Sequence, residues 1–206
     1  MNRSVLWRVG LFLTGAFILI GGPQHPGGTM EQMLADPRWV PGHAAITVGF
    51  AAFLSALVLH RRSVPLTRRA ARWTTYAIWG TAFQVLEMVV HTAAAVDHGR
   101  LVAGEPTPVL TTHLALSLVA YPAFGITVIG WIIATARDRL AGSRWIAWLG
   151  VLGAAAHGAA PPLVVGLNVP GARVLFPMVM LFALWCVLAA FWPRAVEAAS
   201  PARGSA

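Results

Sequence analysis

Long apolar stretches alternate along this chain with short segments rich in arginine, glycine and proline. A helix that crosses the hydrocarbon core of a bilayer needs about 20 mostly apolar residues. Six stretches come near this length, at residues 5–20, 42–59, 73–96, 109–136, 145–165 and 174–192. The pattern predicts an all-α protein, a polytopic integral membrane bundle of six transmembrane helices.

The segments between these stretches are too short to form a soluble domain. Glycines and prolines interrupt the chain over residues 21–28, and residues 21–41 form the only long loop. We therefore expect one transmembrane domain over residues 1–193, followed by a disordered cytoplasmic tail over residues 194–206. The first stretch is short and follows two arginines, as in a signal peptide, but no A-x-A cleavage site closes it, which favours an uncleaved anchor.

The charged residues carry information about orientation. Only 11% of the residues are charged, the formal net charge is +8, and all 15 basic residues are arginine. Twelve of them fall on one predicted side of the bundle: Arg3, Arg8, Arg61, Arg62, Arg68, Arg69, Arg72, Arg137, Arg139, Arg144, Arg194 and Arg203. The opposite side has Arg38, Arg100 and Arg173. Because cytoplasmic loops carry the excess of basic residues, both termini are predicted to be cytoplasmic, in a multi-pass protein of the cell membrane.

The same distribution changes the meaning of the positive charge. The arginines are spread over loops that border apolar helices, so they indicate contact with the lipid bilayer and no binding of nucleic acid. The chain has a single cysteine, which excludes an intramolecular disulfide and a CxxC redox pair. The sequence does not indicate the oligomeric state.

One carboxylate, Glu87, lies inside a predicted span. A charged group at this depth costs at least about 2.5–3.5 kcal/mol on insertion scales, so it must face a cavity or a partner. At about 100° per residue, Gln84, Glu87 and His91 fall on one face of a helix, which we expect to point into the bundle.

Four histidines lie one apiece on the second to fifth predicted spans. They are His43, His91, His113 and His157. At 1.5 Å per residue, the first three come out about 6–8 Å inside the non-cytoplasmic boundary, and His157 and Glu87 about one helical turn deeper. Any one of these histidines alone is better explained by a structural hydrogen bond, but four at similar depth indicate a site. His60, at the inner edge beside Arg61, is expected to reach water.

The first hypothesis is a non-haem metal centre. His43, His91, His113, His157 and Glu87 are its candidate ligands, and zinc or iron is the expected divalent metal, since imidazole suits both. Glu87 is also the candidate catalytic base. A site in the outer half of the membrane would act on a lipid, a quinone or another apolar small molecule. Met30 and Met33, near His25, could bind Cu(I), but an isolated M-x-x-M is weak support and is treated as incidental.

Three alternatives remain open, and so does the question of whether the protein is an enzyme. The first is a haem b cytochrome for electron transfer, in which two of the four histidines are axial ligands. The second is a proton-coupled or ion-coupled carrier that uses Glu87 and the histidines. The third is a membrane subunit without catalytic activity, which would leave the histidine cluster unexplained.

Overall fold

The structure, a computed structural model, describes residues 3–137 and 142–192, and within these ranges it is helical without any strand. The helices in chain order are α1 (Arg3–Gly21), η1 (Gly22–Gln24), α2 (Met30–Ala35), α3 (Trp39–Ser63), α4 (Arg68–Ala93), η2 (Ala94–Asp97), α5 (His98–Val102), α6 (Pro108–Arg137), α7 (Arg144–Pro161), η3 (Pro162–Gly166), η4 (Pro170–Met178) and α8 (Val179–Phe191). The all-α prediction is therefore confirmed. The predicted tail, residues 194–206, lies outside the described residues.

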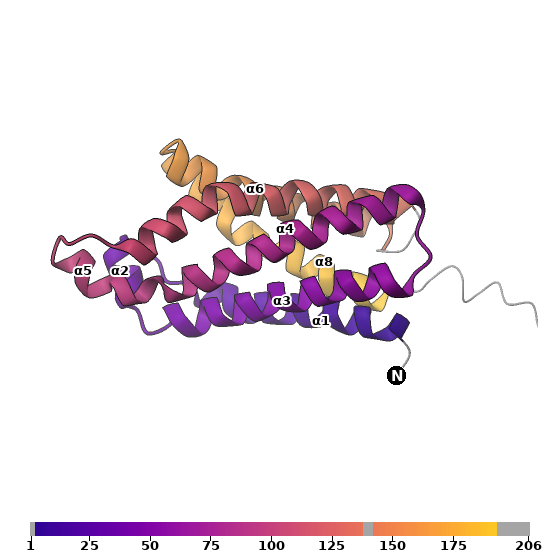
Figure 1. Cartoon of the computed structure of the whole chain (residues 1–206), viewed down its shortest axis with the longest axis horizontal. Helices are drawn as coiled ribbons and strands as arrows, with labels where there is room; N and C mark the ends of the chain where they lie inside the picture. The colour runs from indigo at the N-terminus through magenta and orange to yellow at the C-terminus, as the bar shows by residue number, and fades with distance from the viewer. Residues whose placement is uncertain (1–2, 138–141, 193–206) are drawn as a thin grey trace, which may run out of the picture.

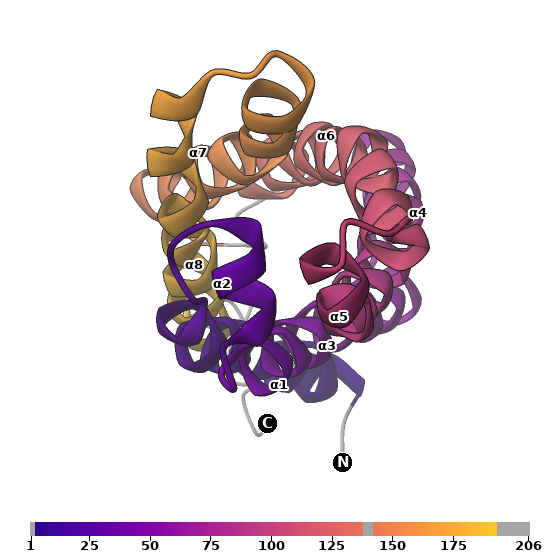
Figure 2. The same ribbon diagram turned by 90° about the vertical axis from the view of Figure 1, so that its left-hand side faces the viewer.

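Six long helices form a closed ring. Each packs against the next in the order α1, α3, α4, α6, α7 and α8, and α8 returns to α1 (Figures 1 and 2). The short helices α2 and α5 lie at one end of this bundle (Figure 1). A ring of helices satisfies its backbone hydrogen bonds within each helix, which is what a bilayer interior requires.

Five segments are long and apolar enough to cross a membrane. They are Val5–Gln24, Trp39–Ser63, Pro108–Ala136, Arg144–Gly166 and Pro170–Phe191. The sixth long helix, α4, is not among them, because polar residues recur along it. Its buried positions include Thr74, Ala77, Thr81, Gln84, Glu87 and His91, which lie three or four residues apart on the face turned into the bundle.

The basic segments gather at one end of the bundle. The connection between α3 and α4, with Arg61, Arg62 and Arg68 beside it, lies at the same end as the start of α1 (Figure 1). There the Arg8 guanidinium donates a hydrogen bond of 2.9 Å to the carbonyl of Trp192. We call this the arginine-rich end, and the opposite one, which carries α2 and α5, the histidine end.

Small residues bring the helices close together around α7. If Gly153 carried a Cβ atom, that atom would overlap the backbone of Phe182 on α8. A Cβ atom added to Gly158 would lie 3.1 Å from the Cα atom of Gly125 on α6. Gly150 and Ala154 are buried on the same side of α7. These small residues let α7 pack against both neighbours.

The last membrane segment is less regular than the apolar run at residues 174–192 indicates. Its first half, Pro170–Met178, is a 3₁₀ helix, and the α-helix begins only at Val179. Before it, α7 ends at Pro161 and a turn of π-helix follows over Pro162–Gly166. The prolines explain the irregularity, because each removes a backbone donor from the α-helical ladder.

Candidate metal centre

A carboxylate and an imidazole pair directly between α4 and α6. The Glu87 Oε1 atom lies 2.6 Å from the His113 Nδ1 atom, and the Gln84 amide donates to Glu87 Oε2 at 3.4 Å. Glu87 and Gln84 are 0% exposed and His113 is 6% exposed. The predicted stripe on α4 thus points inward, and its carboxylate has the polar partners that burial demands.

His91 lies one helical turn from Glu87, on the histidine-end side. Its ring stacks on that of His113 with centroids 3.8 Å apart, and its Nδ1 atom lies 3.9 Å from Glu87 Oε1. The same Nδ1 atom is 3.5 Å from the hydroxyl oxygen of Tyr121, whose O–H donates to the sulfur of Met88 at 3.6 Å. His91 therefore connects the Glu87–His113 pair to the rest of the cluster.

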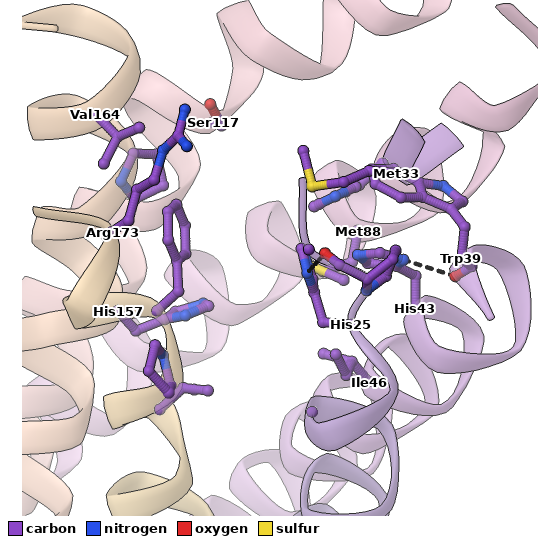
Figure 3. Close-up of a pocket in the computed structure, with 18 of the residues that line it drawn as sticks. His25, Met33, Trp39, His43, Ile46, Met88, Ser117, His157, Val164 and Arg173 are labelled. Carbon is purple, nitrogen blue, oxygen red and sulfur yellow. Dashed lines mark hydrogen bonds between the residues drawn. The ribbon is translucent and has the colours of Figure 1, made fainter. Parts of the chain in front are cut away.

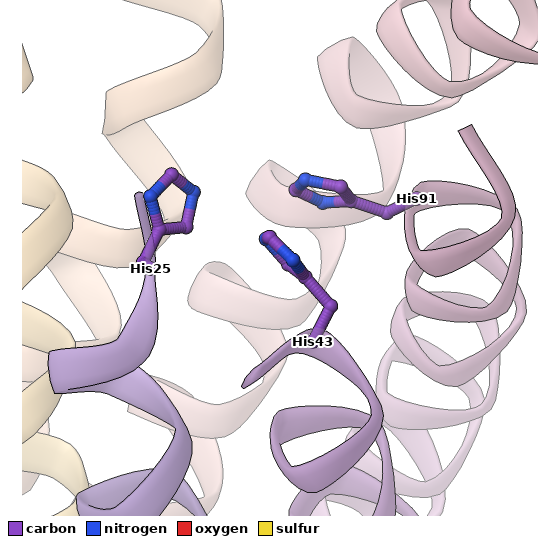
Figure 4. A group of neighbouring side chains, drawn as sticks. All are labelled: His25, His43 and His91. Atoms are coloured by element: carbon purple, nitrogen blue, oxygen red, sulfur yellow. The ribbon is translucent and has the colours of Figure 1, made fainter. Parts of the chain in front are cut away.

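His43 and His25 complete a row of imidazoles. The ring centroids of His43 and His91 are 4.3 Å apart, and those of His25 and His43 are 4.8 Å apart. His43, on α3, is 1% exposed, while His25 follows η1 in the loop after α1. Figure 4 shows the three rings of His25, His43 and His91 turned toward one another from three separate segments.

Two groups of these side chains could hold a metal ion. The first is His25, His43 and His91, and the second is Glu87, His91 and His113; in each, one ligand atom per residue lies within 4.8 Å of the others. The second group contains the 2.6 Å hydrogen bond between Glu87 and His113, which a metal ion would have to replace. The first group contains no such bond among its three rings.

Four of the imidazoles share one feature, which is that the Nδ1 atom contacts an oxygen: His25, His43, His91 and His113. For His25 the oxygen is the carbonyl of Pro26 at 2.9 Å, and for His43 it is the carbonyl of Trp39 at 2.6 Å (Figure 3). A carbonyl can only accept, so Nδ1 carries the proton in both rings and Nε2 has a free lone pair. The Nε2 atom of His43 is buried and has no hydrogen-bond partner among the described residues.

This arrangement is the one that metal-binding histidines commonly have. A ligating imidazole usually donates its other N–H to a carbonyl or carboxylate, which fixes the tautomer and the orientation of the ring. Burial lowers the pKa of His25, the one member of the row outside the membrane segments, and so favours its neutral form. Neutral imidazole is the form that binds a metal.

A cavity opens beside the row. Its volume is about 620 Å³, and His25, His43, His91, His113 and His157 all line it. Most of the remaining wall is apolar, from residues such as Ile46, Leu114, Val164, Val165, Phe176 and Met180. Cavities of this size and character are typical of sites for small molecules.

His157 lies apart from the other predicted ligands. Figure 3 shows it on the wall opposite His25 and His43. Its ring packs on Tyr121 at 4.5 Å and on Phe50 at 5.4 Å between centroids, and it belongs to neither metal-capable group. Its Nε2 atom is buried without a hydrogen-bond partner among the described residues. Of the predicted set, the structure thus brings together His43, His91, His113 and Glu87.

His25 is the member of the cluster that the helix pattern did not select. It lies in the predicted loop, where depth along a helix cannot be assigned, and a tight turn through η1 returns it to the bundle. A signal was nevertheless present in the sequence, because His25 precedes Met30 and Met33, and all three line the cavity.

The prediction that His60 reaches water is wrong. His60 is 1% exposed, and its ring lies edge-on to those of Trp7 at 4.9 Å and Trp131 at 5.7 Å between centroids. The ring packs inside the arginine-rich half of the bundle instead of extending to the surface, because aromatic neighbours from α1 and α6 surround it.

In comparison with known proteins, no family model matches this chain, nor does any curated protein or solved structure. The functional argument therefore depends on the site itself. What the described residues establish is a set of helices apolar enough to span a membrane and a His/Glu group that could bind a metal.

Proposed function

We propose that this protein is a metalloprotein of the cell membrane, in which His25, His43 and His91 hold a non-haem transition metal beside a cavity for an apolar molecule. The observation that carries the proposal is the hydrogen bonding of two of these rings. His25 and His43 each commit Nδ1 to a backbone carbonyl, which leaves Nε2 free. Free imidazole nitrogens from three segments, gathered in one place, are a ligand set for zinc, iron or copper.

The distances are compatible with coordination after a small adjustment. Tetrahedral coordination at 2.0–2.1 Å requires ligand nitrogens about 3.3 Å apart. The ligand atoms of His25, His43 and His91 lie within 4.8 Å of one another, so rotations of the rings by about 1 Å at the nitrogen would suffice. Three protein ligands leave a coordination position open, as in catalytic rather than structural zinc sites.

Glu87 and His113 would then accept and donate protons next to the metal. The pair is buried and joined by the 2.6 Å hydrogen bond, and His91 stacks on His113 at 3.8 Å. A carboxylate that shares a proton with an imidazole can accept a proton from water or from a substrate in the cavity. Glu87 remains the proposed catalytic base, acting through His113.

The cavity supports an apolar small molecule as the substrate. Arg173 is the only arginine among its lining residues, which include no lysine and no carboxylate, and aliphatic, aromatic and proline side chains dominate the rest. A lipid, a quinone or a similar molecule could enter from the outer half of the bilayer and reach the imidazole row.

The membrane topology that we propose has six spans and both termini in the cytoplasm. The helix α4 has 26 residues, about 39 Å at 1.5 Å per residue, and packs between α3 and α6, which are both apolar enough to span. Thr81, Gln84, Glu87 and His91, in the second half of the helix, are buried in the bundle, so their polarity does not oppose insertion. Reporter fusions after residues 66, 105 and 192 should give inside, outside and inside signals respectively.

Elemental analysis of the purified protein tests the metal site. We expect about one equivalent of a transition metal per chain, lost in His43→Gln and retained in the matched control His98→Gln. His98 does not line the cavity and is partly exposed, so its replacement controls for the loss of one imidazole. A metal-free preparation that cannot be reloaded, or equal metal content in both variants, would contradict the proposal.

Haem b is the second candidate cofactor, and one observation favours it. His157 lies across the cavity from His43, its Nε2 atom is free and buried, and the volume between the walls is about 620 Å³. Bis-histidine ligation uses two imidazoles from facing helices. A Soret band in the purified protein that disappears in His157→Ala would support haem, whereas a colourless protein that contains metal supports the three-histidine site.

A further inference from the structure

Methionines gather at the same cavity as the histidines. Four of the six methionines in the chain line it, and these are Met30, Met33, Met88 and Met180. They come from three distant parts of the sequence, α2, α4 and the start of α8. Figure 3 shows Met33 and Met88 on the wall that carries His25 and His43.

Two of these methionines are oriented by the short helix α2. Thr29 caps this helix. Its hydroxyl accepts a hydrogen bond from the backbone N–H of Gln32, and the side-chain oxygen of Gln32 accepts one from the backbone N–H of Thr29. Met30 and Met33 are three residues apart and therefore lie on one face of α2. Both pack against the buried cluster that contains Leu34 and Trp39, and both also line the cavity.

Met88 has a different environment, because its sulfur accepts a hydrogen bond from Tyr121 at 3.6 Å. The thioethers of Met30 and Met33 have no hydrogen-bond partner among the described residues. Both residues line the same cavity as His25, whose Nδ1 atom is already bonded to the Pro26 carbonyl.

We propose that the metal held by this site is copper, taken up as Cu(I), with thioether sulfur from Met30 or Met33 added to the imidazoles of His25, His43 and His91. The inference rests on the proposed metal centre and adds the identity of the ion. Thioether is a soft ligand that selects Cu(I), whereas zinc and iron in oxygen- and nitrogen-rich sites do not use it. Imidazole binds copper as well, so the mixed set of nitrogen and sulfur ligands distinguishes copper from the other metals.

The chemistry of Cu(I) also suits the location. The ion carries one positive charge, and neutral imidazole and thioether ligands leave that charge unchanged. The ligand set of the site contains no carboxylate, because Glu87 is bonded to His113 and Gln84. A monovalent ion with neutral ligands costs less to bury in an apolar region than a divalent one.

Competition titrations test the proposal on the full-length protein in detergent. Cu(I) affinity is measured against a chromophoric Cu(I) chelator under reducing conditions, and Zn(II) affinity against a zinc chelator. The proteins compared are the wild type, the double variant Met30→Leu/Met33→Leu, Met178→Leu and His43→Gln. Met178 does not line the cavity, so Met178→Leu is the matched control. Leucine is close to methionine in volume, so these variants should fold.

We expect the double variant Met30→Leu/Met33→Leu to lose about tenfold or more in Cu(I) affinity while Zn(II) affinity stays constant, and His43→Gln to weaken both. If the methionine variants match Met178→Leu for Cu(I) while His43→Gln still lowers Zn(II) affinity, copper is the wrong ion and the metal centre stands. If His43→Gln changes neither affinity, the metal centre itself is wrong.

Discussion

The two halves of this bundle use buried imidazole in different ways. In the arginine-rich half, His60 is packed among Trp7 and Trp131, and it is not among the residues that line the cavity at the histidine end. At the histidine end, five imidazoles line an open volume of about 620 Å³, and four of them turn Nδ1 to an oxygen. The comparison shows that burial of a histidine does not identify a site. A group of imidazoles that lie together at a cavity is a candidate site.

The polar residues of the arginine-rich half support the same contrast. Thr14, Thr74 and Thr135 are each 0% exposed, and each hydroxyl donates to a carbonyl one turn back on its own helix. Each of these hydrogen bonds lies within one helix and does not connect that helix to a neighbour. A continuous polar path across the bundle, which a proton or ion carrier would need, is therefore not formed by these threonines.

The largest effect that we expect is on the packing of the arginine-rich half. Trp131 is 1% exposed and contacts the rings of Phe53, His60 and Trp185 at 5.7 Å between centroids. Trp131→Ala should lower the free energy of unfolding by about 3–5 kcal/mol because it leaves a large cavity. The folded fraction should keep its metal content, as measured by denaturant unfolding and elemental analysis of the same preparation. Loss of metal without loss of stability would break the separation of the two halves.

A smaller loss of stability is expected at the polar centre. Glu87→Leu removes the acceptor for His113 and for Gln84, and it should lower the free energy of unfolding by about 1–3 kcal/mol, the penalty for a buried polar group that is left unpaired. Glu87→Gln is the control, because its amide oxygen can still accept from His113. Equal unfolding free energies for the two variants would mean that the carboxylate is not held by these hydrogen bonds.

The substitution His157→Phe tests whether His157 belongs to the metal site. The ring lies among Phe50, Tyr121 and Phe124, so a phenyl group of similar shape should change the unfolding free energy by less than about 1.5 kcal/mol. Metal content should match that of the wild type. A metal content that falls to zero, or the loss of a haem spectrum, would make His157 a ligand and support the haem alternative.

The smallest effect is expected in the outer loop. Arg38 lowers the pKa of Asp36 to about 2 through two hydrogen bonds from its side chain. Because the pKa is lowered, the pair contributes above the ordinary aspartate pKa and is lost only as the pH falls through about 2. Asp36→Asn should therefore leave the melting temperature at neutral pH unchanged, since the pair is exposed. A clear drop would show that this loop supports the histidine end.

The sequence predicted those parts of the molecule that follow a regular period. The apolar stretches gave the long helices, and the spacing of Gln84, Glu87 and His91 gave the buried face of α4. Counting residues from the span boundaries predicted that His43, His91 and His113 share a layer, and their rings do stack in a row. In each case a helix of known rise and twist converts sequence position into spatial position.

The remaining features depend on tertiary contacts, which the helical periodicity of the sequence does not predict. His25 is in a loop, and its position is set by a turn through Pro23 and Pro26 and not by helical geometry. His157 has the depth of a ligand, but its rotation about α7 turns it to the aromatic wall. The exposed position predicted for His60 is wrong because Trp7 and Trp131, from two other helices, enclose it.

The location of the metal tests the central claim most directly. Anomalous scattering from crystals of the metal-loaded protein, recorded at the absorption edge of the metal found by elemental analysis, gives that location without reference to activity. The account predicts one peak between the rings of His25, His43 and His91, within about 2.0–2.1 Å of a nitrogen of each. A peak between Glu87 and His113, or no peak within the cavity, would contradict it.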